Sequence, residues 1–431
     1  MKYNVRVLFL RLFDACRHFC NRRAYQIWGY YMEINLADIL YALSTALDCV
    51  EHGLVGITSN HAKRVAYISA GLGRALGFSV QQRLELAACA IMHDSALTEY
   101  LASELDYTIP DREFFSGEAL KAHCVYGEDN MHFLPFGESV DGAVLYHHEN
   151  ADGTGPFGKT IDETPIYAQL VHFGDQLDAN FDLSHMSREK YCEIESYLGK
   201  SSGLFGDKLP KLFLETFSPA LCSRLANESI LLSLKELIPP CKKELSNSEL
   251  KNISTVFARI VDYKSPFTRT HSLGIAEKAM TMGQYYGLSE DKCIVLFASG
   301  ALHDIGKLTV SSEILEKPDK LTSEEYKSVQ NHAFATYSIL RSVDGFERIS
   351  DLAALHHEKL DGSGYPFGRR AEDLDKNVRL MACLDIYQAL TEERPYKAGM
   401  SHGQAMEILR TLGQKGKLDT DIIEDINLCF A

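Results

Sequence analysis

Most of the chain shows the hydrophobic pattern of amphipathic helices. Apolar residues recur at spacings of three and four around most of its polar positions, whereas the strict alternation of a half-buried strand is scarce. Ser79 with Gln82 forms a capping-box pattern, and Thr322 with Glu325 forms another. Ser289, which precedes two acidic residues, indicates a third helix start. We therefore predict an all-α fold.

The polar positions repeat along the chain. The first half carries His61, His93, Asp94, His123, His147, His148 and Asp175. The second half carries, in the same order, His271, His303, Asp304, His332, His356, His357 and Asp385. The partners lie 209 or 210 positions apart throughout. An internal repeat of this length predicts two tandem helical bundles of similar structure.

Composition shifts suggest four segments. Residues 1–31 would be a basic N-terminal extension, 32–190 the first bundle, 191–250 a helical connector and 251–431 the second bundle. Pro239 and Pro240, followed by a polar run, mark the connector's end. The extension is interpreted as a loosely attached segment, with a basic amphipathic arm for a membrane surface or a partner as the alternative.

Charge and cysteine usage limit the class of protein. A net charge of −15 over 431 residues argues against a protein that wraps DNA or RNA, which requires many cations against phosphates. Eleven cysteines without a CxxC pair indicate a reducing compartment, and we expect a cytoplasmic protein. No apolar run reaches the roughly 18 residues that predict a transmembrane helix.

The repeated side chains suit a metal centre. Imidazole and carboxylate groups together bind borderline divalent metals such as Fe, Mn, Ni or Zn, and seven ligands suit a pair of ions. Neighbouring residues on a helix point about 100° apart, so His303 and Asp304 could face different positions while their helix stays regular. Asp304 would then bridge two ions about 3.5 to 4 Å apart. For any single histidine, a buried structural role is the stronger interpretation, so the prediction depends on the whole set.

Three motifs of the second half resemble a known family. HDIGK at 303–307, HHEKLDGSGYP at 356–366 and RPYK at 394–397 are similar to motifs of the HD-GYP family of bacterial cyclic-dinucleotide phosphodiesterases. The resemblance implies one metal held by His271, His303, Asp304 and Asp385, and a second held by Asp304, His332, His356 and His357. It also implies that Lys307 stabilises charge on phosphate, that Tyr365 contacts the substrate and that Arg394 and Lys397 hold its phosphates.

Two positions depart from the family's pattern. Gln388 stands where DxxDAL would have a second aspartate, which puts in doubt the orientation of Lys307 or of water. Phe267 stands where some members have a glutamate for a third metal, so we expect two ions, with Fe, Mn or Ni preferred.

The first half lacks the groups that would handle phosphate. Leu97 replaces the lysine, the loop at 152–156 lacks the tyrosine, and no RPYK counterpart follows Asp175. We interpret this degenerate HD copy as a structural or regulatory domain without phosphodiesterase activity, and leave open whether it binds metal. A second active site with altered substrate preference is the alternative.

The resemblance implies hydrolysis of a 3′,3′-cyclic dinucleotide to its linear form by a metal-bound hydroxide. The tandem arrangement is similar to phosphodiesterases acting on 3′,3′-cyclic GMP-AMP, so we prefer this substrate over cyclic di-GMP. A non-catalytic cyclic-dinucleotide sensor is the main alternative, kept open by Gln388. A nucleotidase of the wider HD superfamily is a third hypothesis, but it leaves the GYP and RPYK motifs unexplained.

Overall fold

Helices make up nearly all the regular structure of the protein, which confirms the all-α prediction. The computed structural model describes residues 32–55, 59–97, 99–100, 118–264, 270–317, 319–393 and 398–431, without the side chains of 49–55 and 118–119. The N-terminal extension predicted at 1–31 lies outside the described residues, and residues 32–431 form one compact unit. Within the described ranges no helix is long and apolar enough to cross a bilayer.

The elements of the first part of the chain are β1 (Met32–Asn35), α2 (Leu36–Val55), α3 (His61–Ala75), α4 (Val80–Met92), α6 (Glu118–His132), η2 (Glu138–Val140), α7 (Ile166–Phe181), α8 (Arg188–Leu198), α9 (Ser202–Phe205), α10 (Lys208–Thr216), α11 (Pro219–Cys222), η3 (Ser223–Leu225), α12 (Ile230–Leu237) and β2 (Lys242–Leu245). Those of the second part are α13 (Asn247–Asp262), α14 (His271–Tyr285), α15 (Glu290–Leu302), η4 (Ile305–Thr309), α16 (Ser312–Leu315), α17 (Ser323–Arg341), α18 (Glu347–Ala354), η5 (Ala371–Asp373), α19 (Lys376–Thr391), α20 (His402–Gln414) and α21 (Thr420–Phe430).

Helix starts follow the sequence signals closely. The capping boxes predicted at Ser79 and Thr322 are both formed, with reciprocal side-chain and backbone hydrogen bonds. Ser289 precedes α15 as expected but makes no capping bond; two acidic residues in the first turn favour this helix start through the helix dipole instead.

The helix ends differ from expectation. The prediction of a regular helix through the His-Asp pair is wrong: α15 ends at Leu302, His303 is its C-cap, and Asp304 is the N-cap of the 3-10 helix η4. The first half behaves alike, because α4 ends at Met92 and His93 follows as the C-cap. The orientation of the histidine and the aspartate is therefore set by a break in the helix. It is not set by the 100° step between neighbouring residues of a continuous helix.

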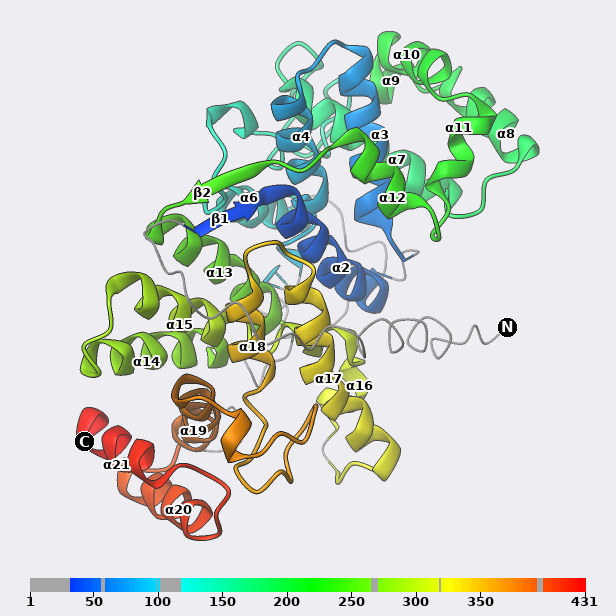
Figure 1. The fold of residues 1–431 in the computed structure, drawn as a ribbon. Coiled ribbons are helices and arrows are strands. Elements are labelled where there is room, and N and C mark those ends of the chain that lie inside the picture. The colour runs from blue at the N-terminus through cyan, green and yellow to red at the C-terminus, as the bar shows by residue number, and fades with distance from the viewer. Residues whose placement is uncertain are drawn as a thin grey trace. The chain divides into compact units, whose positions relative to one another are not determined.

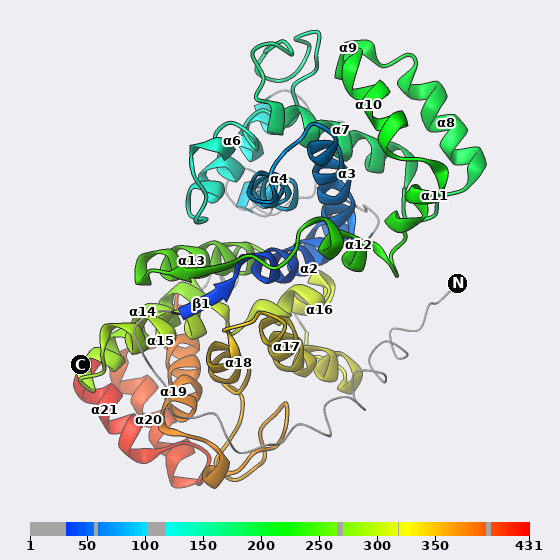
Figure 2. The same ribbon diagram turned by 45° about the horizontal axis from the view of Figure 1, so that its top comes forward.

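The predicted repeat is visible in three dimensions (Figures 1 and 2). In the first bundle α3 packs against α4 and α7, and in the second α14 packs against α15 and α19. His61 and His271 are the first residues of α3 and α14, while Asp175 and Asp385 lie within α7 and α19. Corresponding helices thus deliver corresponding polar side chains, each supported by a core of fully buried aliphatic and aromatic residues.

The two bundles are connected by more than the chain between them. Strand β1, at the start of the first bundle, pairs antiparallel with β2, where Met32 lies opposite Leu245. Helix α2 packs against α3 and α4 of its own bundle and against η4 and α17 of the second. Figure 2 shows α2, in dark blue, beside the yellow helices α16 and α17. The helices α10 and α12 pack on α3. The boundaries at 190 and 250 stay predictions.

The turn between α15 and η4 is fixed tightly to α17. Thr336 on α17 donates a hydrogen bond from Oγ1 to the His303 carbonyl at 2.9 Å and accepts one from the Gly306 backbone N–H at 3.0 Å. A Cβ atom on Gly306 would lie 2.0 Å from the His332 carbonyl oxygen, which is backbone and cannot move aside. Only glycine therefore fits between η4 and α17.

We predict that Gly306→Ala destabilises the protein. Forcing a methyl group against backbone requires a shift of η4, and overpacking of this kind costs about 1–3 kcal/mol. Thermal unfolding of the full chain should show a lower midpoint. Gly403→Ala is the matched control, because a Cβ at Gly403 in α20 meets nothing within 4 Å and alanine favours a helix. Equal midpoints for the two variants would contradict the prediction.

Candidate metal centre

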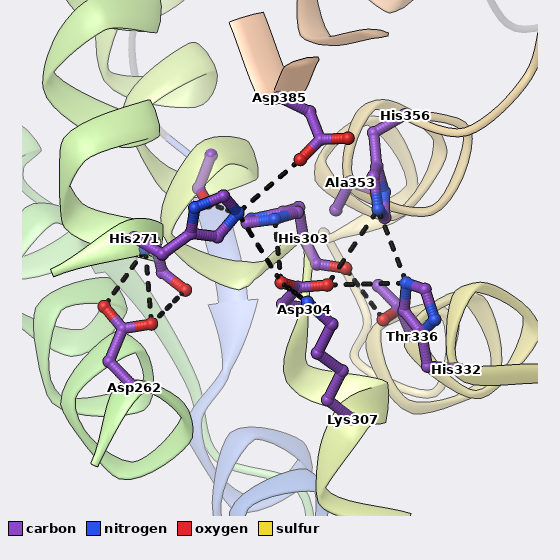
Figure 3. Close-up of polar contacts among 12 residues, drawn as sticks. Asp262, His271, His303, Asp304, Lys307, His332, Thr336, Ala353, His356 and Asp385 are labelled. Carbon is purple, nitrogen blue, oxygen red and sulfur yellow. Dashed lines mark hydrogen bonds and ion pairs between the residues drawn. The ribbon is translucent and has the colours of Figure 1, made fainter. Parts of the chain in front are cut away.

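All seven candidate ligands of the second bundle converge at one place. Figure 3 labels all of them except His357. They come from the start of α14, the turn between α15 and η4, the middle of α17, the segment after α18 and the middle of α19. Their side chains are buried except for that of His357, which is 22% exposed. Their ligand atoms form two sets, and the atoms of each set lie within 4.8 Å of one another. One set comprises His271, His303 and Asp304, and the other comprises His332, His356 and His357.

Asp304 lies between these two sets. Its Oδ2 is 3.1 Å from His303 Nε2 and 3.8 Å from His271 Nε2. Its Oδ1 is 3.4 Å from His332 Nε2 and 4.0 Å from His356 Nε2. One carboxylate therefore offers an oxygen to each set, which is the arrangement that a bridging ligand requires.

Asp385 also faces both sets. Its Oδ1 lies 3.5 Å from His271 Nε2, and its Oδ2 lies 3.5 Å from His357 Nδ1. The structure thus brings together every side chain that the resemblance implicated in metal binding, while the assignment of each to a particular ion stays a prediction.

Three of the imidazoles are oriented by the backbone. In His303, His332 and His356, Nδ1 donates to the carbonyl three residues earlier, so Nε2 is directed into the centre. His303 Nε2 and Asp304 Oδ1 are buried and make no hydrogen bond within the described residues. Buried polar atoms without partners are costly, and a divalent ion would satisfy both, so the donor set fits a metal.

Electrostatics keep His332, His357 and Asp304 in the form that binds metal. Burial lowers the pKa of His332 to about 4 and that of His357 to about 3, so both are neutral at pH 7. Burial would raise the pKa of Asp304, but the charges of His303 and Lys307 outweigh it and hold that pKa well below its usual range. The carboxylate is therefore ionised.

His271 is oriented by Glu392, which the sequence analysis missed. Its Nδ1 lies 3.1 Å from Glu392 Oε2, and Thr270 donates to the other carboxylate oxygen at 3.0 Å. Burial lowers the pKa of His271, but hydrogen bonds to Asp385 and Glu392 reverse this and raise it to about 9. In the first bundle the corresponding His61 uses Asp178, at 2.7 Å.

The repeat offset explains why Glu392 was missed. Asp178 corresponds to Gln388, so the carboxylate that orients the histidine has moved one helical turn along α19. Gln388 instead accepts a hydrogen bond from Lys278 at 2.7 Å and packs against Gly274, where a Cβ would lie 2.3 Å from Gln388 Nε2. Its contacts are thus with α14, whereas the sequence had linked it to Lys307 or to water.

Asp262, at the end of α13, is a second residue that the sequence did not reveal. Its buried carboxylate accepts hydrogen bonds from the backbone N–H and the hydroxyl of Ser272 (Figure 3). Thr270, the N-cap of α14, makes no side-chain capping bond, so Asp262 takes that role from a neighbouring helix. Burial raises the pKa of Asp262 to about 7.

Two of the proposed substrate-handling residues, Lys307 and Tyr365, lie at the edge of the centre. Lys307 Nζ is 2.5 Å from Asp304 Oδ2, and the Tyr365 ring centroid is 4.7 Å from that of His357. Lys264 supports the lysine's segment by donating to the carbonyls of Leu308 and Val310. Arg394 and Lys397, and with them Phe267, lie outside the described residues.

The first bundle assembles its own counterparts. His61, His93 and Asp175 form one set of neighbouring ligand atoms, and His123, His147 and His148 form part of another. Leu97, at the position of Lys307, is buried and apolar. The polar cluster is thus retained, whereas the ammonium group is not.

Comparisons with known proteins agree with the repeat. Two family models described as HD domain match residues 58–180 and 255–422. The chain is 29% identical over 412 residues to the 3′3′-cGAMP-specific phosphodiesterase 1 of Vibrio cholerae, which covers 91% of each protein. It is 31% identical over 320 residues to phosphodiesterase 3 of the same organism, covering 73% of this chain and 68% of that protein.

More distant similarities were also found. The cyclic di-GMP phosphodiesterase response regulator RpfG of Xanthomonas campestris is 32% identical over 189 residues, 43% of this chain and 49% of that protein. Among solved structures, a Vibrio cholerae cyclic GMP-AMP specific phosphodiesterase, V-cGAP3, aligns with a TM-score of 0.62 and 23% identity, covering 92% of this chain and 98% of that chain. The latter similarity shows a shared fold.

We predict that Glu392→Gln weakens metal binding. The amide keeps the shape but removes the charge that fixes His271, and loss of such an outer partner typically costs roughly 10- to 100-fold in affinity. Titration with Mn²⁺ followed by electron paramagnetic resonance would measure the change. Glu424→Gln is the control, because Glu424 pairs with Arg410 at the surface. Unchanged affinity in Glu392→Gln would contradict the assigned role.

Proposed function

Because the chain belongs to the HD-GYP family of cyclic-dinucleotide phosphodiesterases, we propose that its second bundle hydrolyses a 3′,3′-cyclic dinucleotide to the linear dinucleotide. The observation that carries the proposal is the position of Asp304, with one oxygen toward each of two sets of imidazoles and Lys307 beside it. A mere sensor would need neither this bridging geometry nor the ammonium.

The preferred substrate is 3′,3′-cyclic GMP-AMP. The relative that aligns over 91% of both proteins, including the first bundle, is named for this substrate. Cyclic di-GMP is the second candidate, because relatives that match 43% and 38% of this chain are named for it. The arrangement of two bundles in one chain therefore supports the first choice.

We propose a pair of divalent ions, Fe, Mn or Ni, in the second bundle. The first would be held by His271, His303, Asp304 and Asp385, and the second by Asp304, His332, His356 and His357. The pair would supply an activated water and a clamp on the phosphate oxygens. The neutral state of His332 and His357 at pH 7 supports this assignment.

The protein's own groups orient the substrate and stabilise charge. Lys307 carries an ammonium beside the bridging carboxylate, suited to stabilise charge that develops on phosphate. The Tyr365 ring packs against His357 in a tilted arrangement and would form a wall for the substrate. Arg394 and Lys397 would hold its phosphates, with the guanidinium suited to bidentate contact.

The proposed location is the cytoplasm, with no nucleic-acid polymer as partner. The cysteines whose side chains are described are free thiols, which fits a reducing compartment. The net charge of −15 opposes binding to a polyphosphate chain.

Substituting the bridging aspartate in each bundle should separate their roles. We expect Asp304→Ala to abolish formation of linear product, because both ions lose a shared ligand, whereas Asp94→Ala retains turnover. Product from 3′,3′-cyclic GMP-AMP and from cyclic di-GMP, with Mn²⁺ added, would be followed by chromatography. Faster cleavage of cyclic di-GMP would overturn the substrate choice, and binding without product would establish a sensor.

Lys307→Met should lower kcat while the metal stays bound. Removal of one group that stabilises transition-state charge typically costs about 10²- to 10³-fold in kcat. Metal content by mass spectrometry, measured on the same samples, separates this effect from loss of the centre. A variant with normal kcat would exclude the lysine from catalysis.

A further inference from the structure

We propose that the first bundle holds its own metal ion and that Cys124 is one of its ligands, which makes this centre a closed site for zinc or another thiolate-preferring ion. The proposal concerns the first bundle alone and does not depend on the activity proposed for the second.

Four potential ligands meet in the first bundle. Ligand atoms of His123, Cys124, His147 and His148 all lie within 4.8 Å of one another. Cys124 Sγ is 3.7 Å from His123 Nε2, and His148 Nε2 is 3.2 Å from the same atom. A tetrahedral zinc ion with ordinary bond lengths separates sulfur from nitrogen by roughly 3.6 Å and two nitrogens by roughly 3.3 Å. These two distances therefore match such a site.

His147 provides independent support for a ligand in this place. Its Nδ1 lies within hydrogen-bond distance of the Val144 carbonyl, so Nε2 is directed toward Asp94, 3.8 Å from Oδ1. This Nε2 belongs to a fully buried ring and makes no hydrogen bond within the described part of the chain. A metal ion in the cluster would satisfy this nitrogen, while the Cys124 thiol lies 3.8 Å from Nδ1 of the same ring.

The alternative interpretation is that Cys124 is a small buried hydrophobic residue and not a metal ligand. Its neighbours argue against this, because Sγ lies within 4 Å of nitrogens of both His123 and His147. Cys222 is equally buried but lies in α11, outside this cluster.

The difference from the second bundle determines the type of ion. By the repeat offset, Cys124 corresponds to Ala333, so the second bundle has no thiol at this place. Leu97 in turn replaces Lys307, so the first bundle has no ammonium to share the bridging carboxylate. Thiolate favours zinc over Mn or Fe(II), and a site closed by protein ligands is structural rather than catalytic.

The test uses the full-length protein loaded with Co²⁺ as a spectroscopic substitute for zinc. We expect a thiolate-to-cobalt charge-transfer band in the near ultraviolet that is lost in Cys124→Ala and persists in Asp304→Ala. Cys222→Ala, which removes a buried thiol away from the cluster, should keep the band. Zinc affinity, from competition with a chelator, should fall at least about 10-fold in Cys124→Ala.

Alanine at the equivalent position 333 indicates that Cys124→Ala can fold, and Cys124→Ser provides a second variant of nearly the same shape. The proposal is overturned if the band persists in folded Cys124→Ala, if it is lost only in Asp304→Ala, or if the wild-type protein shows no such band at any cobalt ratio.

Discussion

The burial of one carboxylate governs the second bundle. Asp304 is 2% exposed, and an ionised group in such a place is stable only with opposite charge or strong hydrogen-bond donors around it. Five elements therefore converge on it, each contributing a histidine, a lysine or a second acid. The end of α15, the turn into η4 and the tight fit of Gly306 against α17 all serve to place this carboxylate. Its neighbours are in turn oriented from behind by backbone carbonyls and by Glu392.

The sequence predicted the arrangement at the level of repeats and helix starts. A nearly constant offset identified both sets of ligands without any alignment, and capping patterns such as Thr322 with Glu325 located helix N-termini to the residue. These signals are local or strictly periodic, so they can be recognised in the sequence alone. The helix break after Leu302 carries no such signal, because a packing contact with Thr336 on a distant helix causes it.

Partners that lie far apart in sequence were harder to find. Glu392 contacts His271 from 121 positions away. The sequence clue to this role is that the first bundle has Asp178 where the second has Gln388, so another carboxylate must take its place. Asp262 caps a helix that it does not belong to. Cys124 drew no prediction from the sequence, and one of its imidazole neighbours, His147, lies 23 positions away. In each case the role of the side chain depends on the residues that it contacts in the folded protein.

The contact of α2 with η4 has a mechanical consequence. The first bundle supplies the surface against which the Lys307 segment rests, and Lys264 secures that segment from the other side. The first bundle is therefore in direct contact with the segment of the second bundle that carries Lys307. A change that loosens the packing of α2 would therefore shift η4 and, with it, Lys307.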